Sequence, residues 1–205
     1  MSRKLAIIVG NGPLERDLSV TVDSADFVMR FNEPNLSGGW SGTRTDILVL
    51  SVSSKQFQKR MAEPQFVENA AVKAAKEVML AYHPAIIRKY HPRPNIVQRL
   101  KGRRADWTDR AIEIMHSAGK EVRVMPPQFY LDGCAALRIP QQRMRELFPS
   151  TGYLGITYIL DRFALSEWDI KLCGFTWEGW KRHPWNEERA WVEDKIANGR
   201  LDTIR

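Results

Sequence analysis

The chain has 205 residues and a formal net charge of +7, with 43% hydrophobic and 27% charged residues. This length and composition predict a single globular domain covering residues 1–205, and they exclude a disordered or collagen-like chain. No apolar run approaches the ~20 residues needed to span a bilayer, and no secretory signal peptide is recognisable, so a cytoplasmic protein is expected.

Apolar runs and turn residues divide the chain into alternating strands and helices. Strands are expected at 4–9, 26–31, 46–50, 78–81, 122–125 and 169–173; helices are expected from Pro13 and at 54–61, 66–75, 106–118, 151–165 and 186–197. Such alternation is typical of a mostly parallel sheet with helices on both faces. The predicted fold class is therefore α/β, with a single Rossmann-like domain.

The first candidate site is the turn Gly10-Asn11-Gly12-Pro13, between the first strand and the helix expected after it. This turn would lie at the carboxyl edge of the sheet, where backbone N–H groups and a helix N-terminus can hold a phosphate. A dinucleotide fingerprint needs a third glycine where Glu15 stands, and the second strand ends in Arg30-Phe31-Asn32 without a ribose-binding acid. A tight turn and a nucleotide cradle both remain open.

Positive charge is concentrated between Arg88 and Arg104. This stretch contains no acidic residue, and its basic residues are Arg88, Lys89, Arg93, Arg99, Lys101, Arg103 and Arg104. Such a cluster attracts anionic partners, whether nucleic acid, a phosphorylated ligand or an acidic glycan. The simpler interpretation is a solvated basic face.

A second candidate site is Pro149-Ser150-Thr151-Gly152, at the start of the helix expected to run to Leu165. Ser150 or Thr151 can cap this helix, while both hydroxyls and the Gly152 N–H can also face a ligand. A cap without any further function is the alternative.

A third candidate site lies in the segment from Trp168 to Trp191. Five of the seven tryptophans lie there, and they are Trp168, Trp177, Trp180, Trp185 and Trp191. Tryptophan rings can hold a sugar or a base, and His183 can accept a proton from a hydroxyl near neutral pH. Glu188 would lie in the first turn of the next helix, where it could orient that histidine. A structural aromatic cluster with a surface histidine is the alternative.

No metal site is expected from the remaining residues. His83 and His91 precede prolines, His116 lies within a predicted helix, and no cysteine or acid stands at ligand spacing. The two cysteines, Cys134 and Cys173, are expected to be buried free thiols.

In this order the motifs resemble those of the sialyltransferases of glycosyltransferase family 29. Three segments resemble the family's long motif, and they are Ile7 to Pro13, Val22 to Pro34 and Ser41 to Asp46. Pro149 to Gly152, together with Gly174-Phe175, resembles its short motif. His183-x-x-x-x-Glu188 resembles its very short motif. The chain is most similar to small bacterial members of this group labelled urease operon accessory protein. Ala6 and about Phe163 stand where the family has a cysteine bridge, and the family's additional histidine motif is not evident at 175–180.

The resemblance implies a GT-A-like sialyltransferase variant of the Rossmann-like fold. It further implies an inverting, metal-independent transferase that moves a nonulosonic acid from a CMP-activated donor to the hydroxyl of a glycan or other acceptor, with no further cofactor. On this basis His183 is the general base, assisted by Glu188. The nucleotide-binding residues would be Gly10, Asn11, Gly12, Arg30, Asn32, Ser150, Thr151 and Gly152, with Arg44 as a further candidate at the leaving phosphate.

Two other functions stay open at this point. The chain could be a non-catalytic accessory or scaffold protein that keeps the nucleotide cleft and supports urease. Residues Arg88 to Arg104 could instead bind an anionic partner, although nucleic acid is the less favoured one.

Overall fold

The computed structural model describes residues 3–36, 39–53 and 55–204. These residues form one seven-stranded sheet in the order β5-β4-β3-β2-β1-β6-β7, in which every neighbouring pair is parallel. The strands are β1 (Lys4–Val9), β2 (Phe27–Phe31), β3 (Ile47–Leu50), β4 (Glu77–Leu80), β5 (Glu121–Val124), β6 (Trp168–Cys173) and β7 (Asp202–Thr203). The sequence predicted the first six to within one residue at each end, and it missed β7.

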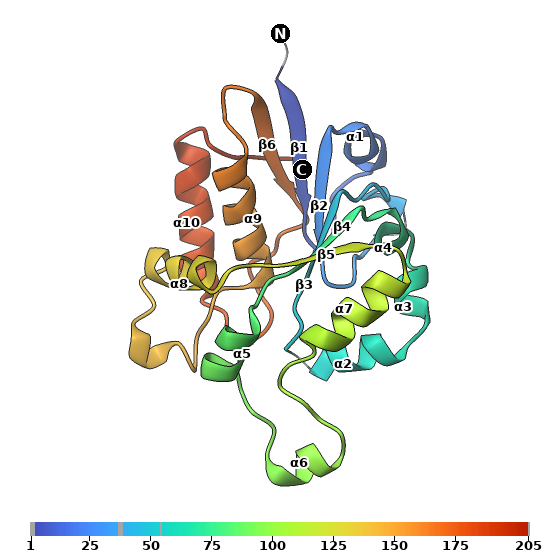
Figure 1. The fold of residues 1–205 in the computed structure, drawn as a ribbon. Coiled ribbons are helices and arrows are strands. Elements are labelled where there is room, and N and C mark those ends of the chain that lie inside the picture. The colour runs from blue at the N-terminus through green and yellow to red at the C-terminus, as the bar shows by residue number, and fades with distance from the viewer. Residues whose placement is uncertain (1–2, 37–38, 54, 205) are drawn as a thin grey trace.

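Helices cover both faces of the sheet, as the sequence predicted (Figure 1). They are α1 (Ser19–Ser24), α2 (Lys55–Ala62), α3 (Gln65–Glu68), α4 (Ala70–Ala74), α5 (Pro84–Tyr90), α6 (Ile96–Leu100), α7 (Thr108–Ser117), α8 (Pro127–Ala136), the 3-10 turn η2 (Gln141–Arg143), α9 (Thr151–Arg162) and α10 (Trp185–Ala197). In the ranges that the structure describes, no helix is both long and apolar enough to cross a bilayer.

The central strand β1 is buried on both faces, which explains its continuous apolar sequence. Ala6 and Ile8 point into the larger core, whereas Ile7 and Val9 point into a smaller core completed by α1. The cysteines expected to be buried free thiols are both buried and unpaired. Burial raises the pKa of each thiol to about 11, so neither is a reactive thiolate at neutral pH.

The helix boundaries differ most from the sequence prediction in three places. No helix starts at Pro13, because residues 13–18 form an irregular segment and α1 begins only at Ser19. The helix predicted at 66–75 is interrupted at Asn69, whose side chain accepts hydrogen bonds from the backbone of the next turn and thereby caps α4. Helix α9 ends at Arg162, since Phe163 adopts an extended conformation and stacks on Trp168. Ser54, predicted to begin a helix, lies outside the described residues.

The order of the strands determines where a ligand can bind. From β1 the chain builds the sheet outward through β2, β3, β4 and β5, and it then returns to place β6 on the other side of β1. The border between β1 and β6 is therefore a topological switch point, and ligands of open α/β sheets bind beyond the carboxyl ends of the strands there.

Candidate functional site

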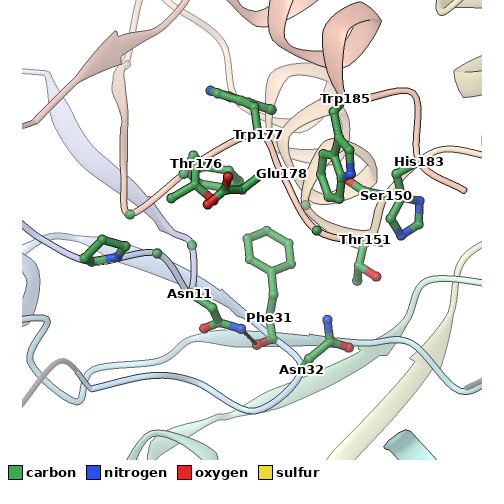
Figure 2. Close-up of a pocket in the computed structure, with 17 residues that line it drawn as sticks. Asn11, Phe31, Asn32, Ser150, Thr151, Thr176, Trp177, Glu178, His183 and Trp185 are labelled. Atoms are coloured by element: carbon green, nitrogen blue, oxygen red, sulfur yellow. Dashed lines mark hydrogen bonds between the residues drawn. The ribbon is translucent and has the colours of Figure 1, made fainter. Parts of the chain in front are cut away.

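A cleft of about 680 Å³ opens at this switch point. Its walls come from the segments that follow β1, β2 and β6 and from the start of α9 (Figure 2). Figure 2 shows Asn11 and Asn32 on one side of the cleft, with Thr176 and Trp177 across from them. The lining residues are Gly10, Asn11, Gly12, Pro13, Phe31, Asn32, Ser150, Thr151, Gly152, Gly174, Phe175, Thr176, Trp177, Glu178, Gly179, His183 and Trp185. Of the predicted catalytic and nucleotide-binding residues, all but Arg30, Arg44 and Glu188 are among them.

The glycines of the first turn serve close packing between backbones. The N–H of Gly10 donates to the carbonyl of Cys173, and the N–H of Gly12 donates to that of Gly174, both at 2.8 Å. A Cβ on Gly10 would lie 2.2 Å from the Gly174 oxygen, so no other residue fits there. The sequence left a tight turn and a nucleotide cradle open here. The engaged amides and the absence of a helix at Pro13 favour the tight turn.

The two asparagines differ in what they leave for a ligand. Both ends of the Asn11 amide are engaged, because Nδ2 donates to the Phe31 carbonyl at 2.9 Å and Oδ1 accepts from the Asn35 N–H at 3.1 Å. Asn32 has a φ of 52°, and its Oδ1 accepts from the Ser51 N–H at 2.9 Å. Its Nδ2 donates to no group in the described part of the chain, so this amide is a donor available inside the cleft.

The start of α9 supplies further donors. The Ser150 side chain caps the helix by accepting from the Tyr153 N–H at 3.0 Å. The N–H groups of Thr151 and Gly152 lie in the first turn, where no intrahelical acceptor exists, and both residues line the cleft. An anion placed there would meet two backbone donors and the positive end of the helix dipole.

Glu188 holds the start of α9 in place instead of orienting His183. It is fully buried, and its two carboxylate oxygens accept from the Ser150 N–H at 2.7 Å and the Ser150 hydroxyl at 2.6 Å. Burial raises the pKa of Glu188 to about 7, although both hydrogen bonds act to lower it. The role predicted for this carboxylate, beside the histidine ring, is therefore corrected to support of the neighbouring helix.

His183 is fixed by a backbone group, and this decides its tautomer. Its Nδ1 lies 2.9 Å from the Phe148 carbonyl, which can only accept, so Nδ1 carries the proton and donates. In the neutral ring Nε2 then carries a lone pair. Burial lowers the pKa of His183, an effect partly offset by this hydrogen bond, so the neutral form dominates at pH 7. His183 therefore has the neutral form and the lone pair that a general base requires.

Two arginines predicted for the nucleotide site bind groups of the protein itself. Arg30 is 1% exposed, and its guanidinium donates to the carbonyls of Arg44, Ser41 and Gly42 at 3.0, 2.5 and 3.0 Å. Desolvation lowers its pKa to about 10, so the buried group stays charged and braces the 41–44 loop. Arg44 pairs with Asp46 at 3.1 Å. Neither lines the cleft, and among the residues that the structure describes no lysine or arginine does.

The tryptophans separate into two groups. Trp177 and Trp185 line the cleft, and Trp180 and Trp185 meet the His183 ring edge-on at 5.3 and 5.0 Å. Trp168 stacks on Phe163 and Trp191 packs against Tyr153, both away from the cleft. The predicted five-membered platform is thus corrected to a smaller aromatic wall.

Sequence reasoning singled out too little of the loop after β6. Thr176, Glu178 and Gly179 all line the cleft, and Glu178 is its acidic residue. Gly174, directly after the strand that borders the switch point, was the available signal. In the described ranges, no group of three or more histidine, cysteine or acidic side chains is placed to hold a metal ion.

Comparison with solved structures identifies the architecture. A mammalian sialyltransferase superposes with a TM-score of 0.60 at 15% identity, over 100% of this chain and 70% of that one. The sialyltransferase CstII from Campylobacter jejuni, solved with the substrate analogue CMP-3FNeuAc, gives 0.58 at 13% identity, over 98% and 80% of the two chains. The fold is that of the sialyltransferases.

A protein that is similar in sequence carries a name other than sialyltransferase. A urease operon 23 kDa accessory protein from Rhizobium meliloti is 29% identical over 209 aligned positions, which cover 98% of this chain and 92% of that protein. No family model matches the chain. The sialyltransferase-like fold is thus shared with enzymes, whereas the similar sequence carries the name of an accessory protein.

Proposed function

We propose that the protein is a glycosyltransferase that uses a CMP-activated nonulosonic acid and transfers the sugar to an acceptor hydroxyl. The observation that carries this proposal is the juxtaposition of two features on one cleft. His183, which carries a lone pair on Nε2, lines the cleft, and so do Thr151 and Gly152, whose N–H groups have no acceptor within α9. Solved proteins with this fold include a sialyltransferase in complex with a CMP-sugar analogue, which supports the choice of donor.

Each group has a defined part in the proposed reaction. The Thr151 and Gly152 amides would hold the phosphate of CMP, and the free Nδ2 of Asn32 would donate to the nucleotide. His183 Nε2 would take the proton of the acceptor hydroxyl as its oxygen bonds to the anomeric carbon. The bond from that carbon to the phosphate oxygen breaks, and CMP leaves with the electron pair and inversion of the anomeric centre. No cofactor besides the donor is needed.

The test is hydrolysis of CMP-linked nonulosonic acids, which requires no knowledge of the acceptor. His183→Ala should lower turnover by ~10²-fold or more, the usual contribution of a general base, and should leave CMP affinity measured by calorimetry within about twofold. His116→Ala, an exposed histidine on α7, is the matched control and should behave as wild type. Unchanged turnover in His183→Ala would eliminate this residue as the base.

A non-catalytic accessory protein is the second candidate, favoured by the name of the Rhizobium relative. Such a protein would retain the cleft as a nucleotide sensor or scaffold associated with urease. It predicts measurable CMP binding with no turnover of any CMP-linked donor by the wild type. Absence of CMP binding at millimolar concentration by folded protein would contradict both candidates.

A further inference from the structure

The chain projects from the body of the protein between α5 and α7 (Figure 1). We refer to residues 88–104, which begin in the last turn of α5, as the projection. The chain leaves the carboxyl end of β4, forms α5, and reaches the short helix α6 at the tip of the projection. It returns where the Trp107 N–H donates to the Val52 carbonyl at 3.0 Å, just beyond the carboxyl end of β3. The projection therefore emerges from the same edge of the sheet that carries the cleft.

The tip of this projection is apolar and exposed. Ile96, Val97 and Leu100 are 76%, 60% and 84% exposed, and no residue of α6 is buried. Ile96 and Val97 lie four and three positions before Leu100, so the three side chains share one face of the helix. Exposed aliphatic residues gathered in this way mark an interaction site more often than a chance surface.

The first turn of α6 is held in shape by hydrogen bonds within the helix itself. Asn95 Oδ1 accepts from the Gln98 N–H at 2.8 Å, and Gln98 Oε1 accepts from the Asn95 N–H at 3.2 Å. This reciprocal capping box stabilises the first turn locally. The aliphatic face is therefore formed before any partner arrives.

The projection also carries many positive charges. Its basic residues are Arg88, Lys89, Arg93, Arg99, Lys101, Arg103 and Arg104, and the same stretch has no acidic residue. Within the described residues none of the seven takes part in an ion pair. Their charge is therefore available to an anionic surface.

We propose that this projection, residues 88–104, binds the surface of a membrane rich in anionic phospholipids. Ile96, Val97 and Leu100 enter the boundary between headgroups and acyl chains, and the surrounding cations meet the lipid phosphates. A nucleic acid would satisfy the cations but offers no dry environment for the three aliphatic side chains. The helix at the tip has five residues, fewer than the roughly 20 to 30 residues that each partner contributes to a standard protein interface. This seating turns the edge with the cleft toward the bilayer.

Vesicle co-sedimentation tests the proposal directly and does not depend on CMP chemistry. Wild-type protein should bind vesicles with about 30 mol % phosphatidylserine at least tenfold more tightly than pure phosphatidylcholine vesicles. Binding should weaken steeply between about 0.05 and 0.5 M NaCl. Tryptophan fluorescence and circular dichroism of the lipid-free protein establish that each variant below remains folded.

Two variants separate the apolar from the electrostatic contribution. Ile96→Ser with Leu100→Ser should lower the partition coefficient at least tenfold, whereas Val20→Ser, an equally exposed aliphatic residue on α1, should not change it. Arg99→Gln with Lys101→Gln should lower the partition coefficient about fivefold for each cation removed. Arg189→Gln on α10 should lower the partition coefficient less.

Three outcomes would overturn the proposal. The first is wild-type vesicle binding by the double serine variant, which would show that the aliphatic tip is not inserted. The second is salt-sensitive binding to a single-stranded RNA that exceeds binding to the anionic vesicles, which would assign the projection to nucleic acid. The third is a dimer in sedimentation velocity that dissociates in the double serine variant, which would assign the tip to a second copy of the chain.

Discussion

Replacing Glu188 by glutamine should change how the stability of the protein depends on pH. The carboxyl group is fully buried and accepts two hydrogen bonds from Ser150. Glutamine has the same shape, its Oε1 can accept from the Ser150 N–H, and its Nε2 can donate to the Ser150 oxygen. The substitution therefore removes the titration while keeping the packing.

The size of the effect follows from the raised pKa. Burial moves the pKa of Glu188 from 4.5 to about 7, so between these values the unfolded chain releases a proton that the folded protein keeps. The free energy of unfolding then falls as pH rises, by about 1.4 kcal/mol for each pH unit and about 3 kcal/mol over the interval. Below pH 4.5 the carboxyl is protonated in both states and imposes no penalty. The glutamine variant should lack this loss.

Two histidines titrate in the same range with the opposite sign. Burial lowers the pKa of His91 to about 3 and also lowers that of His183, so their contribution to stability rises with pH toward the ordinary histidine value near 6.5. The wild-type profile alone mixes these effects. Urea unfolding of wild type and Glu188→Gln at about pH 4.5 and about pH 7.5 isolates the carboxyl by difference. Profiles that run parallel would refute the inference that Glu188 has a raised pKa.

Further substitutions test the packing of the cleft. Gly10→Ala should destabilise the protein by more than about 3 kcal/mol in urea unfolding, because backbone must move away from the new Cβ, whereas Gly152→Ala, whose nearest neighbour is a Phe175 ring atom at 3.1 Å, should cost less than about 1.5 kcal/mol. Asn32→Gly keeps the left-handed backbone and should weaken CMP binding about fivefold or more in calorimetry, while Asn32→Ala should also lose stability. His91→Phe should reduce the loss of stability between about pH 6.5 and pH 4, measured by thermal unfolding, since it removes a buried group that must be neutral.

The sheet was readable from the sequence because its longer strands are either short apolar runs, as in β1 and β3, or alternate apolar with polar residues, as in β5 and β6. The missed helices had signals of a different kind. Helix α5 has Pro84 at its start with the His83 side chain as its cap, and α8 begins at Pro127. Proline in the first turn is a favourable start for a helix, but apolar periodicity alone does not reveal it. Strand β7 contains two residues, too few for any periodic pattern.

The candidate site was predictable in its members but not in its contacts. The sequence placed Gly10, Asn32, Ser150 and His183 at the ends of elements that a parallel sheet brings to one edge, and all four line the cleft. Their hydrogen-bonding partners come from distant parts of the chain. The acceptor for Gly10 lies after another strand, at Cys173, and local patterns carry no information about such a pairing. The same holds for the buried guanidinium of Arg30, which resembles a ligand-binding group until its partners are known.

The contacts around Phe148 and Ser150 connect the two halves of the proposed chemistry. The Phe148 carbonyl accepts a hydrogen bond from the His183 ring, and the Phe148 N–H donates to the Arg182 carbonyl at 2.9 Å. Ser150 donates two hydrogen bonds to Glu188. The short segment that leads into α9 is therefore bonded at three points to the segment that leads into α10. Fixed donors and a fixed base avoid the cost of ordering them during a reaction, which is how an electrostatic site gains its effect. No lysine or arginine of the described residues lines the cleft, so in the proposed reaction the positioned backbone dipoles would have to stabilise the departing phosphate. A change at Glu188 would thus act on catalysis through the placement of α9, although its carboxylate does not reach the cleft.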